Sequence, residues 1–160
     1  LYWNLLEVRT AVHAAPPETA GMWLDCTNRV TYTKTKTSTV STHQELLAQG
    51  LPGLIFSGDH DTVVPHTGTE SWIASLNLDL LTPWTPWYYP DSAQERPQVG
   101  GYVTVYDNLV YATVKGAGHE VAQTKPQQMY LLWSSFLTGS KSFSNSSDYP
   151  LSPLTTTILE

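Results

Sequence analysis

The strongest constraint on the fold is a pair of alternating stretches, GYVTVYDNLVYATVKG, at residues 101–116. Both halves are rich in Val, Tyr and Thr, residue types that suit a pleated, half-buried strand. Asp107 and Asn108 separate the two halves, and a turn pair of this kind closes a β-hairpin. The stretch therefore predicts two antiparallel strands joined by a tight turn.

Helices and a further strand are predicted around this hairpin. Helices are expected over residues 5–14, 43–49, 69–76 and 125–137. The second of these follows a capping box in which Thr42 precedes Glu45 by three positions. The short apolar run 51–56 predicts a buried strand, and the proline-rich stretch 83–91, PWTPWYYPD, predicts a connection whose rings serve as packing. Helices alternating with strands place the chain in the α/β class.

Length and charge narrow the class of protein. The 160 residues are 41% hydrophobic, which is enough for one domain with a core. We predict that this domain covers residues 1–139 and that the Ser- and Thr-rich stretch 140–160 is a flexible tail. A net charge of −6 with scattered Lys and Arg argues against nucleic acid as a partner. Apolar runs such as 129–133 are far shorter than the ~20 residues that cross a bilayer, so no membrane partner is expected.

Two polar loops directly follow predicted strands. FSGDHDTVVP carries polar residues directly after strand 51–56, and VKGAGHEVA carries them at the end of the hairpin. Ligands of open α/β sheets bind beyond the carboxyl ends of strands, so both loops are candidate site segments. A carboxylate followed along the chain by His119 matches the Asp-then-His order of an α/β-hydrolase triad. In such a triad the carboxylate orients the imidazole, which takes a proton from the nucleophile.

Other interpretations of these residues remain open at this point. A histidine at a strand end is more often structural than catalytic. Asp59, His60, Asp61 and His66 are ordinary metal ligands, but their spacing matches no HExxH-like motif, and no metal is expected. The two aspartates can also bond backbone amides within their loop.

The chain lacks a recognisable nucleophile and has a single cysteine. No G-x-S-x-G elbow occurs in the sequence. Cys26 cannot form an internal disulfide, so it is either a buried thiol or half of a bridge to another chain. Asn145 begins an N-S-S acceptor pattern for N-glycosylation. Because the sequence starts without Met and directly in a periodic apolar pattern, we expect a processed or truncated piece.

Several segments together resemble one family, the serine carboxypeptidases of the peptidase S10 type, and in particular the smaller C-terminal chain of the plant two-chain forms. The segments that carry the resemblance occur in the family's order: YWNLLEVRTAVHA, MWLDCTN, GLPGLIFSGDHDTVVP, QVGGYVTVYDNLVYATVKGAGHEV and FLTG. The resemblance implies the C-terminal part of an α/β-hydrolase fold, with flanking helices and a β-hairpin, completed by a partner chain.

The resemblance also assigns roles to individual residues. It implies Asp61 as the triad carboxylate, His119 as the triad base and Glu120 as part of the pocket for the residue before the scissile bond. It implies that the serine belongs to a larger N-terminal chain, to which Cys26 is joined by an interchain disulfide in an oxidising compartment. The implied location is the secretory pathway, ending in a vacuole or lysosome or outside the cell. No cofactor is implied, and a dimer of such two-chain units stays open.

We therefore predict the small chain of a serine carboxypeptidase that removes C-terminal amino acids from peptides. A hydroxynitrile lyase and an acyltransferase are alternatives on the same scaffold, and a non-catalytic interaction subunit is an alternative of another class. The charge of Glu120 favours the peptidase, because a charged pocket wall suits a peptide side chain better than a small aromatic cyanohydrin.

Overall fold

The computed structural model describes residues 2–24, 27–91, 93–94 and 96–139. The chain divides into two compact units, Leu1–Thr37 and Ser38–Glu160. The predicted tail, residues 140–160, lies outside the described residues. The extent of the predicted domain, residues 1–139, stays a prediction.

In the N-terminal unit, the described residues form three short helical segments followed by an extended stretch without regular structure. The helical segments are the 3-10 helix Tyr2–Asn4, α1 (Leu6–Ala11) and α2 (Pro17–Ala20). The helix predicted over residues 5–14 is therefore shorter than expected. It ends early because His13 adopts a positive φ of 56°, which a right-handed helix cannot continue.

A buried arginine holds the N-terminal unit together. Arg9 is 6% exposed and donates to the carbonyl oxygens of Ala15 and Gly21, each at 3.0 Å. It also donates to the side-chain oxygen of Asn4 at 3.3 Å. That asparagine exchanges two hydrogen bonds with the backbone of Trp23. The guanidinium thus links α1 to the connection before α2, to the residue that ends α2 and, through Asn4, to Trp23.

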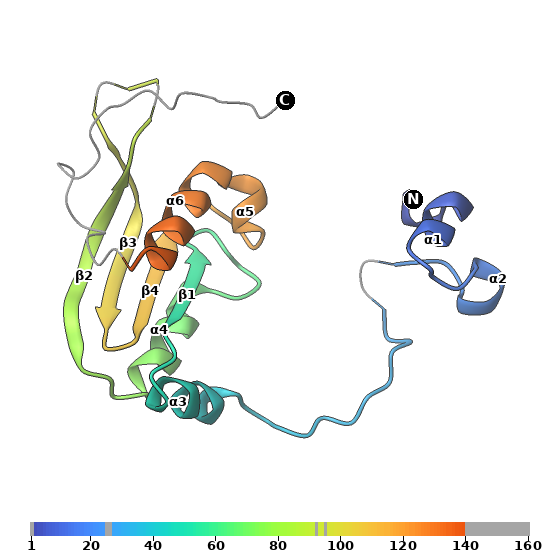
Figure 1. Cartoon of the computed structure of the whole chain (residues 1–160), viewed down its shortest axis with the longest axis horizontal. Helices are drawn as coiled ribbons and strands as arrows, with labels where there is room; N and C mark the ends of the chain where they lie inside the picture. The colour runs from blue at the N-terminus through green and yellow to red at the C-terminus, as the bar shows by residue number, and fades with distance from the viewer. Residues whose placement is uncertain (1, 25–26, 92, 95, 140–160) are drawn as a thin grey trace. The chain divides into compact units, whose positions relative to one another are not determined.

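The second unit is built on a four-stranded mixed sheet (Figure 1). Its strand order is β1-β4-β3-β2. The predicted hairpin is confirmed, since β3 and β4 pair antiparallel through a turn in which Asn108 has a φ of 58°. β1 lies parallel to β4 at one edge. The strand bounds are β1 (Gly53–Gly58), β2 (Leu80–Tyr89), β3 (Gln98–Tyr106) and β4 (Leu109–Val114).

Helices cover both faces of this sheet, as Figure 1 shows for α6 on the near face. One hydrophobic cluster joins Val103 and Val114 of the sheet to Leu132 of α6. The other joins Leu109 and Tyr111, which point to the opposite face, to residues of α3 and α4. This helix-sheet-helix layering confirms the α/β class.

The helices of this unit begin and end close to the predicted positions, with three differences. α3 (Val40–Ala48) begins before Thr42, so the expected capping box does not form and Thr39 stands at the N-cap position. α4 (His66–Ala74) begins and ends earlier than residues 69–76. α6 (Pro126–Leu137) agrees with the prediction, and the short α5 (Val121–Thr124) was not predicted. Within the described part of the chain, no helix has the length and apolar character needed to cross a bilayer.

The stretch 83–91 is mostly a strand and not the predicted connection. It forms the greater part of β2, the edge strand, whose register against β3 shifts at three places. Prolines are tolerated there because an edge strand can leave one side of its backbone unpaired. Trp87 of this strand is 2% exposed and donates its indole N–H to the carbonyl of Thr113 at 2.9 Å. The ring packs as predicted, but it does so from within the sheet.

Candidate active site

Both polar loops leave the same end of the sheet. β1 and β4 are parallel neighbours, and Gly58 is paired with Val114 where the two strands end. The loop after β1 carries Asp59 and Asp61, and the loop after β4 carries His119. The parallel pairing therefore brings together side chains that are 58 positions apart in the sequence.

Hydrogen bonds from backbone amides join the two loops to each other. The amide of His60 donates to the carbonyl of Ala117 at 3.0 Å, and the amide of Gly116 donates to Oδ1 of Asp59 at 2.7 Å. A β-carbon on Gly58 would collide with the carbonyl oxygens of Ala117 and Gly118. Glycine is required at this position because the loops approach each other so closely.

Asp61 and His119 form a hydrogen-bonded pair. Nδ1 of His119 lies 2.9 Å from Oδ2 of Asp61. The other carboxylate oxygen, Oδ1, accepts the amides of Val63 at 2.8 Å and Val64 at 3.0 Å. These two hydrogen bonds fix the position of the carboxylate, and a fixed carboxylate in turn fixes the ring orientation and tautomer of its histidine.

The electrostatics of the pair favour a charged carboxylate beside a basic imidazole. The bond from His119 holds the pKa of Asp61 below its ordinary value, and the amide of Val64 lowers it further. The bond to Asp61 and its negative charge raise the pKa of His119 above its ordinary value. The side chain of Asp61 is only 6% exposed, whereas that of His119 is 51% exposed. An oriented carboxylate thus supports an imidazole that is open to solvent.

The second ring nitrogen of His119, Nε2, is on the part of the ring that does not face Asp61. Among the residues that the structure describes, none forms a hydrogen bond with this atom. Glu120 follows directly, is exposed, and contributes a small increase to the pKa of His119 through its charge. The geometry therefore brings the three predicted site residues Asp61, His119 and Glu120 to one place, while their roles stay predictions.

The alternative metal cluster is not assembled in the described residues, where no group of three or more possible ligands comes together. Asp59 and Asp61 instead bond backbone amides, as the competing interpretation of the loop held. His60 is 74% exposed, and its Nε2 is 3.9 Å from Oδ1 of Asp59. His66 begins α4, and its carbonyl accepts the hydroxyl of Tyr111 at 3.1 Å.

Two predicted sites cannot be placed. Cys26 and Asn145 both lie outside the described residues, so the predicted disulfide and the predicted glycosylation stay predictions. Sequence reasoning missed the bond between Asp59 and Gly116, which joins the two loops. The signal was present in part, because an acidic residue directly after one strand can reach a glycine turn after its parallel neighbour.

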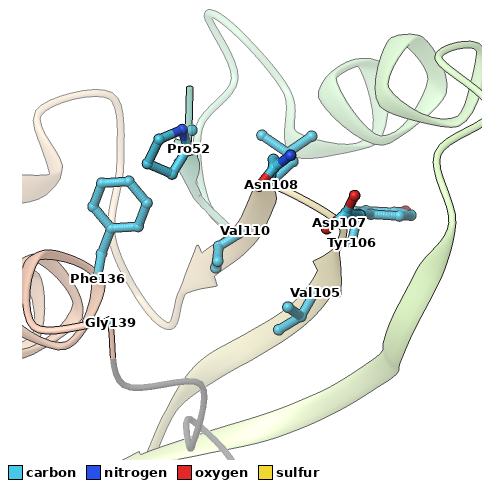
Figure 2. A pocket seen from close by; sticks show the side chains of 10 residues that line it. Pro52, Val105, Tyr106, Asp107, Asn108, Val110, Phe136 and Gly139 are labelled. Carbon is cyan, nitrogen blue, oxygen red and sulfur yellow. The ribbon is translucent and has the colours of Figure 1, made fainter. Parts of the chain in front are cut away.

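A small cavity lies at the other end of the sheet (Figure 2). Its volume is about 140 Å³, and its walls include Pro52 before β1, Asn108 in the hairpin turn and Phe136 of α6. Because Asp61 and His119 follow the carboxyl ends of β1 and β4, this cavity is separate from the candidate active site.

Comparison with known proteins decides the family. Residues 1–139 match the peptidase S10 family, described as serine carboxypeptidase. The chain belongs to this family. Serine carboxypeptidase 1 of Hordeum vulgare is 41% identical over 135 residues, which are 84% of this chain and 26% of that protein. Putative serine carboxypeptidase-like 23 of Arabidopsis thaliana is 42% identical over 142 residues, or 87% of this chain and 30% of that protein.

A solved carboxypeptidase structure agrees with the fold. The prohormone-processing carboxypeptidase Kex1(delta)p of Saccharomyces cerevisiae superimposes with a TM-score of 0.64 at 18% identity. The match covers 86% of this chain and 30% of that chain. The predicted α/β-hydrolase fold is confirmed, and the chain spans about a quarter to a third of the length of these relatives.

Proposed function

We propose that this chain supplies the aspartate and histidine of a Ser-Asp-His triad in a serine carboxypeptidase. The observation that carries the proposal is the 2.9 Å contact between Nδ1 of His119 and Oδ2 of Asp61. It leaves Nε2 on a half-exposed ring, the nitrogen that acts as general base in such triads. Family membership supports the same reaction class.

In the proposed mechanism, Nε2 of His119 takes the proton of a serine hydroxyl as the serine oxygen attacks the last peptide carbonyl. Asp61 stabilises the imidazolium that forms. The imidazolium then gives its proton to the departing amine of the C-terminal amino acid, and the peptide remains as an acyl-enzyme. A water molecule, deprotonated by the same nitrogen, releases the shortened peptide and restores the serine. Neither a metal nor an organic cofactor takes part.

The proposed serine comes from a larger N-terminal chain. The 160 residues contain no G-x-S-x-G elbow, and the relatives are three to four times longer than the matched segment. The sheet supports this division, because no described strand pairs with the outer edge of β1. Phe56 of this strand is 41% exposed, whereas strands of a parallel α/β sheet are usually covered on both faces.

The proposed substrate is a peptide with a free C-terminal carboxylate. The groups that bind this carboxylate are assigned to the larger chain. The family resemblance assigns Glu120 to the pocket for the residue before the scissile bond, and its exposed carboxylate beside His119 would suit a basic peptide side chain there.

The proposal extends to assembly and location. Cys26 would bridge to the larger chain, and such a bond requires an oxidising compartment, so the protein is assigned to the secretory pathway and then to a vacuole, a lysosome or the extracellular space. Asn145 would carry the glycan. Electrophoresis without reductant tests the bridge: this chain migrates with its partner if the bond exists and separates from it only after reduction.

Blocked dipeptides and a cyanohydrin distinguish the proposed reaction from its alternatives. Protein assembled with its larger chain is expected to release a C-terminal amino acid from the dipeptides. Release of cyanide alone would assign a hydroxynitrile lyase, and transfer of the acyl group to an added alcohol in place of water would assign an acyltransferase. A partner without a nucleophile elbow, together with no turnover of either substrate, would assign a non-catalytic subunit.

Substitution of the pair tests the assigned roles. His119→Ala and Asp61→Asn are each expected to lower kcat by about three to four orders of magnitude, as loss of a triad member does elsewhere. His60→Ala is the matched control, because this neighbouring histidine is 74% exposed and lies outside the pair. Full activity in His119→Ala would contradict the triad.

A further inference from the structure

The loop that carries His119 is packed into the core at Ala117, which is 0% exposed, while His119 itself lies outside that core. The loop joins the end of β4 at Val114 to the start of α5 at Val121, and its Gly116 adopts a positive φ of 69°. The side chain of His119 is half exposed, so buried neighbours do not fix its position. Beside the packing of Ala117, hydrogen bonds from the loop after β1 hold the backbone on either side of the turn, at Gly116 and at Ala117.

Asp59 is the residue that connects the two loops through its side chain. Its amide donates to the carbonyl of Val114 at 3.2 Å, and its Oδ1 accepts the amide of Gly116 at 2.7 Å. The second contact is short and has a charged acceptor, and such bonds are about twice as strong as neutral ones. It binds the residue at which the histidine loop makes its left-handed turn.

The same loop also carries the acid that orients His119. Asp59 and Asp61 are two positions apart, so one short segment holds both the histidine ring and the backbone three residues before it. If the bond to Gly116 were displaced, the histidine loop could move while Asp61 stayed bonded to the amides of Val63 and Val64. The distance between Nδ1 and Oδ2 would then change.

We infer that Asp59 is a positioning residue, which sets the distance between His119 and Asp61 by binding the amide of Gly116. This inference rests on the proposed function, because it concerns the same triad. No hydrogen bond or ion pair joins the side chain of Asp59 to the ring of His119 in the described part of the chain; this side chain accepts the amide of Gly116 and lies 3.9 Å from Nε2 of the exposed His60. Its effect on the reaction is therefore indirect.

Two substitutions separate position from charge. Asp59→Asn removes the charge but keeps a side-chain oxygen at the same reach, whereas Asp59→Glu keeps the charge and moves the oxygen by one methylene. Asp91→Glu is the matched control, because Oδ1 of Asp91 also accepts a backbone amide, that of Ala93 at 2.9 Å, within its own loop. All variants are made in the protein assembled with its larger chain.

We expect Asp59→Glu to lower kcat for a blocked dipeptide by about ten- to a hundredfold, because small misplacements of a catalytic group have effects of this size. KM should change little, and the control should match the parent protein. Asp59→Asn should retain activity within about threefold, since its weaker bond to Gly116 is still present. In ¹⁵N NMR, the pKa of His119 should fall toward its ordinary value in Asp59→Glu and much less in Asp59→Asn.

A larger loss of kcat in Asp59→Asn than in Asp59→Glu would overturn the inference and would assign the effect to the charge of Asp59. Equal losses in both, or no loss in either, would overturn it as well. Should circular dichroism show that Asp59→Glu does not fold, Asp59→Ala removes the same bond without adding volume and is expected to behave as described for the glutamate. A parent protein without peptidase activity would refute the proposed function, whereas the NMR titration would still test Asp59.

Discussion

The two carboxylates of the β1 loop have different hydrogen-bond partners. Asp61 accepts hydrogen bonds from two amides of its own loop and contacts a ring nitrogen of His119, while Asp59 accepts one from an amide of the neighbouring loop. The family resemblance implies Asp61 as the partner of His119, and the structure brings these two side chains into contact. The sequence could not predict the hydrogen bond between Asp59 and the amide of Gly116, because this bond depends on how closely two parallel strands bring their loops together.

The pKa of His119 provides a test of the pair that does not require turnover. A hydrogen bond to a carboxylate favours imidazolium, and the bond to Asp61 is the main cause that raises the pKa of His119 above its ordinary value. In Asp61→Asn the charge and much of the bond are lost, and the midpoint should move down. NMR titration of the assembled protein measures both midpoints. A midpoint that stays unchanged in Asp61→Asn would contradict the assigned cause.

At the scale of elements, the hairpin and α6 followed from local pattern, whereas β2 did not. Alternation and a turn pair specify a hairpin within a few neighbouring residues, and α6 has a proline at its start and an apolar stripe. β2 contains Pro83 and Pro86, which argue against a central strand, and only its place at the sheet edge makes them acceptable. Edge position depends on the order of all the strands in the sheet, so the residues of this stretch alone cannot predict it.

The close approach of the loops predicts opposite effects for two glycine substitutions. Gly58→Ala should destabilise the fold by about 2–3 kcal/mol, because its new methyl group would meet the backbone of Ala117 and Gly118. Gly68→Ala, in α4, has no heavy atom within 4 Å of the new carbon and should stabilise the fold by about 0.5–1 kcal/mol. Urea unfolding measures both. Equal effects would mean that the loops are not in contact.

One side-chain hydrogen bond ties α4 to the sheet. The hydroxyl of Tyr111 donates to the carbonyl of His66 at 3.1 Å, and burial raises the pKa of this tyrosine, so the hydroxyl stays a neutral donor. Tyr111→Phe should lower the free energy of unfolding by about 1 kcal/mol. Tyr130→Phe, at a side chain that is 68% exposed, should change it by less than about 0.5 kcal/mol. The same measurement on both variants tests the bond.

At the scale of the whole molecule, β1 is the element through which the chain would join its larger partner. The strand pairs with β4 on one side only among the described residues, although the parallel pairing of β1 and β4 is typical of a strand inside a larger sheet. Phe56 is the large apolar side chain that this strand leaves 41% exposed. The proposed assembly would cover both the edge and the ring.

Burial of Phe56 in the assembled protein can therefore be predicted. Phe56→Ala should lower the free energy of unfolding of the two-chain protein by about 3–5 kcal/mol, because it would leave a cavity in an interface that excludes water. Hydrogen exchange should also show slow exchange for β1 amides that do not bond β4, since the next strand would accept them. A change below about 0.5 kcal/mol, with fast exchange of those amides, would mean that β1 remains an outer strand and that the partner binds elsewhere.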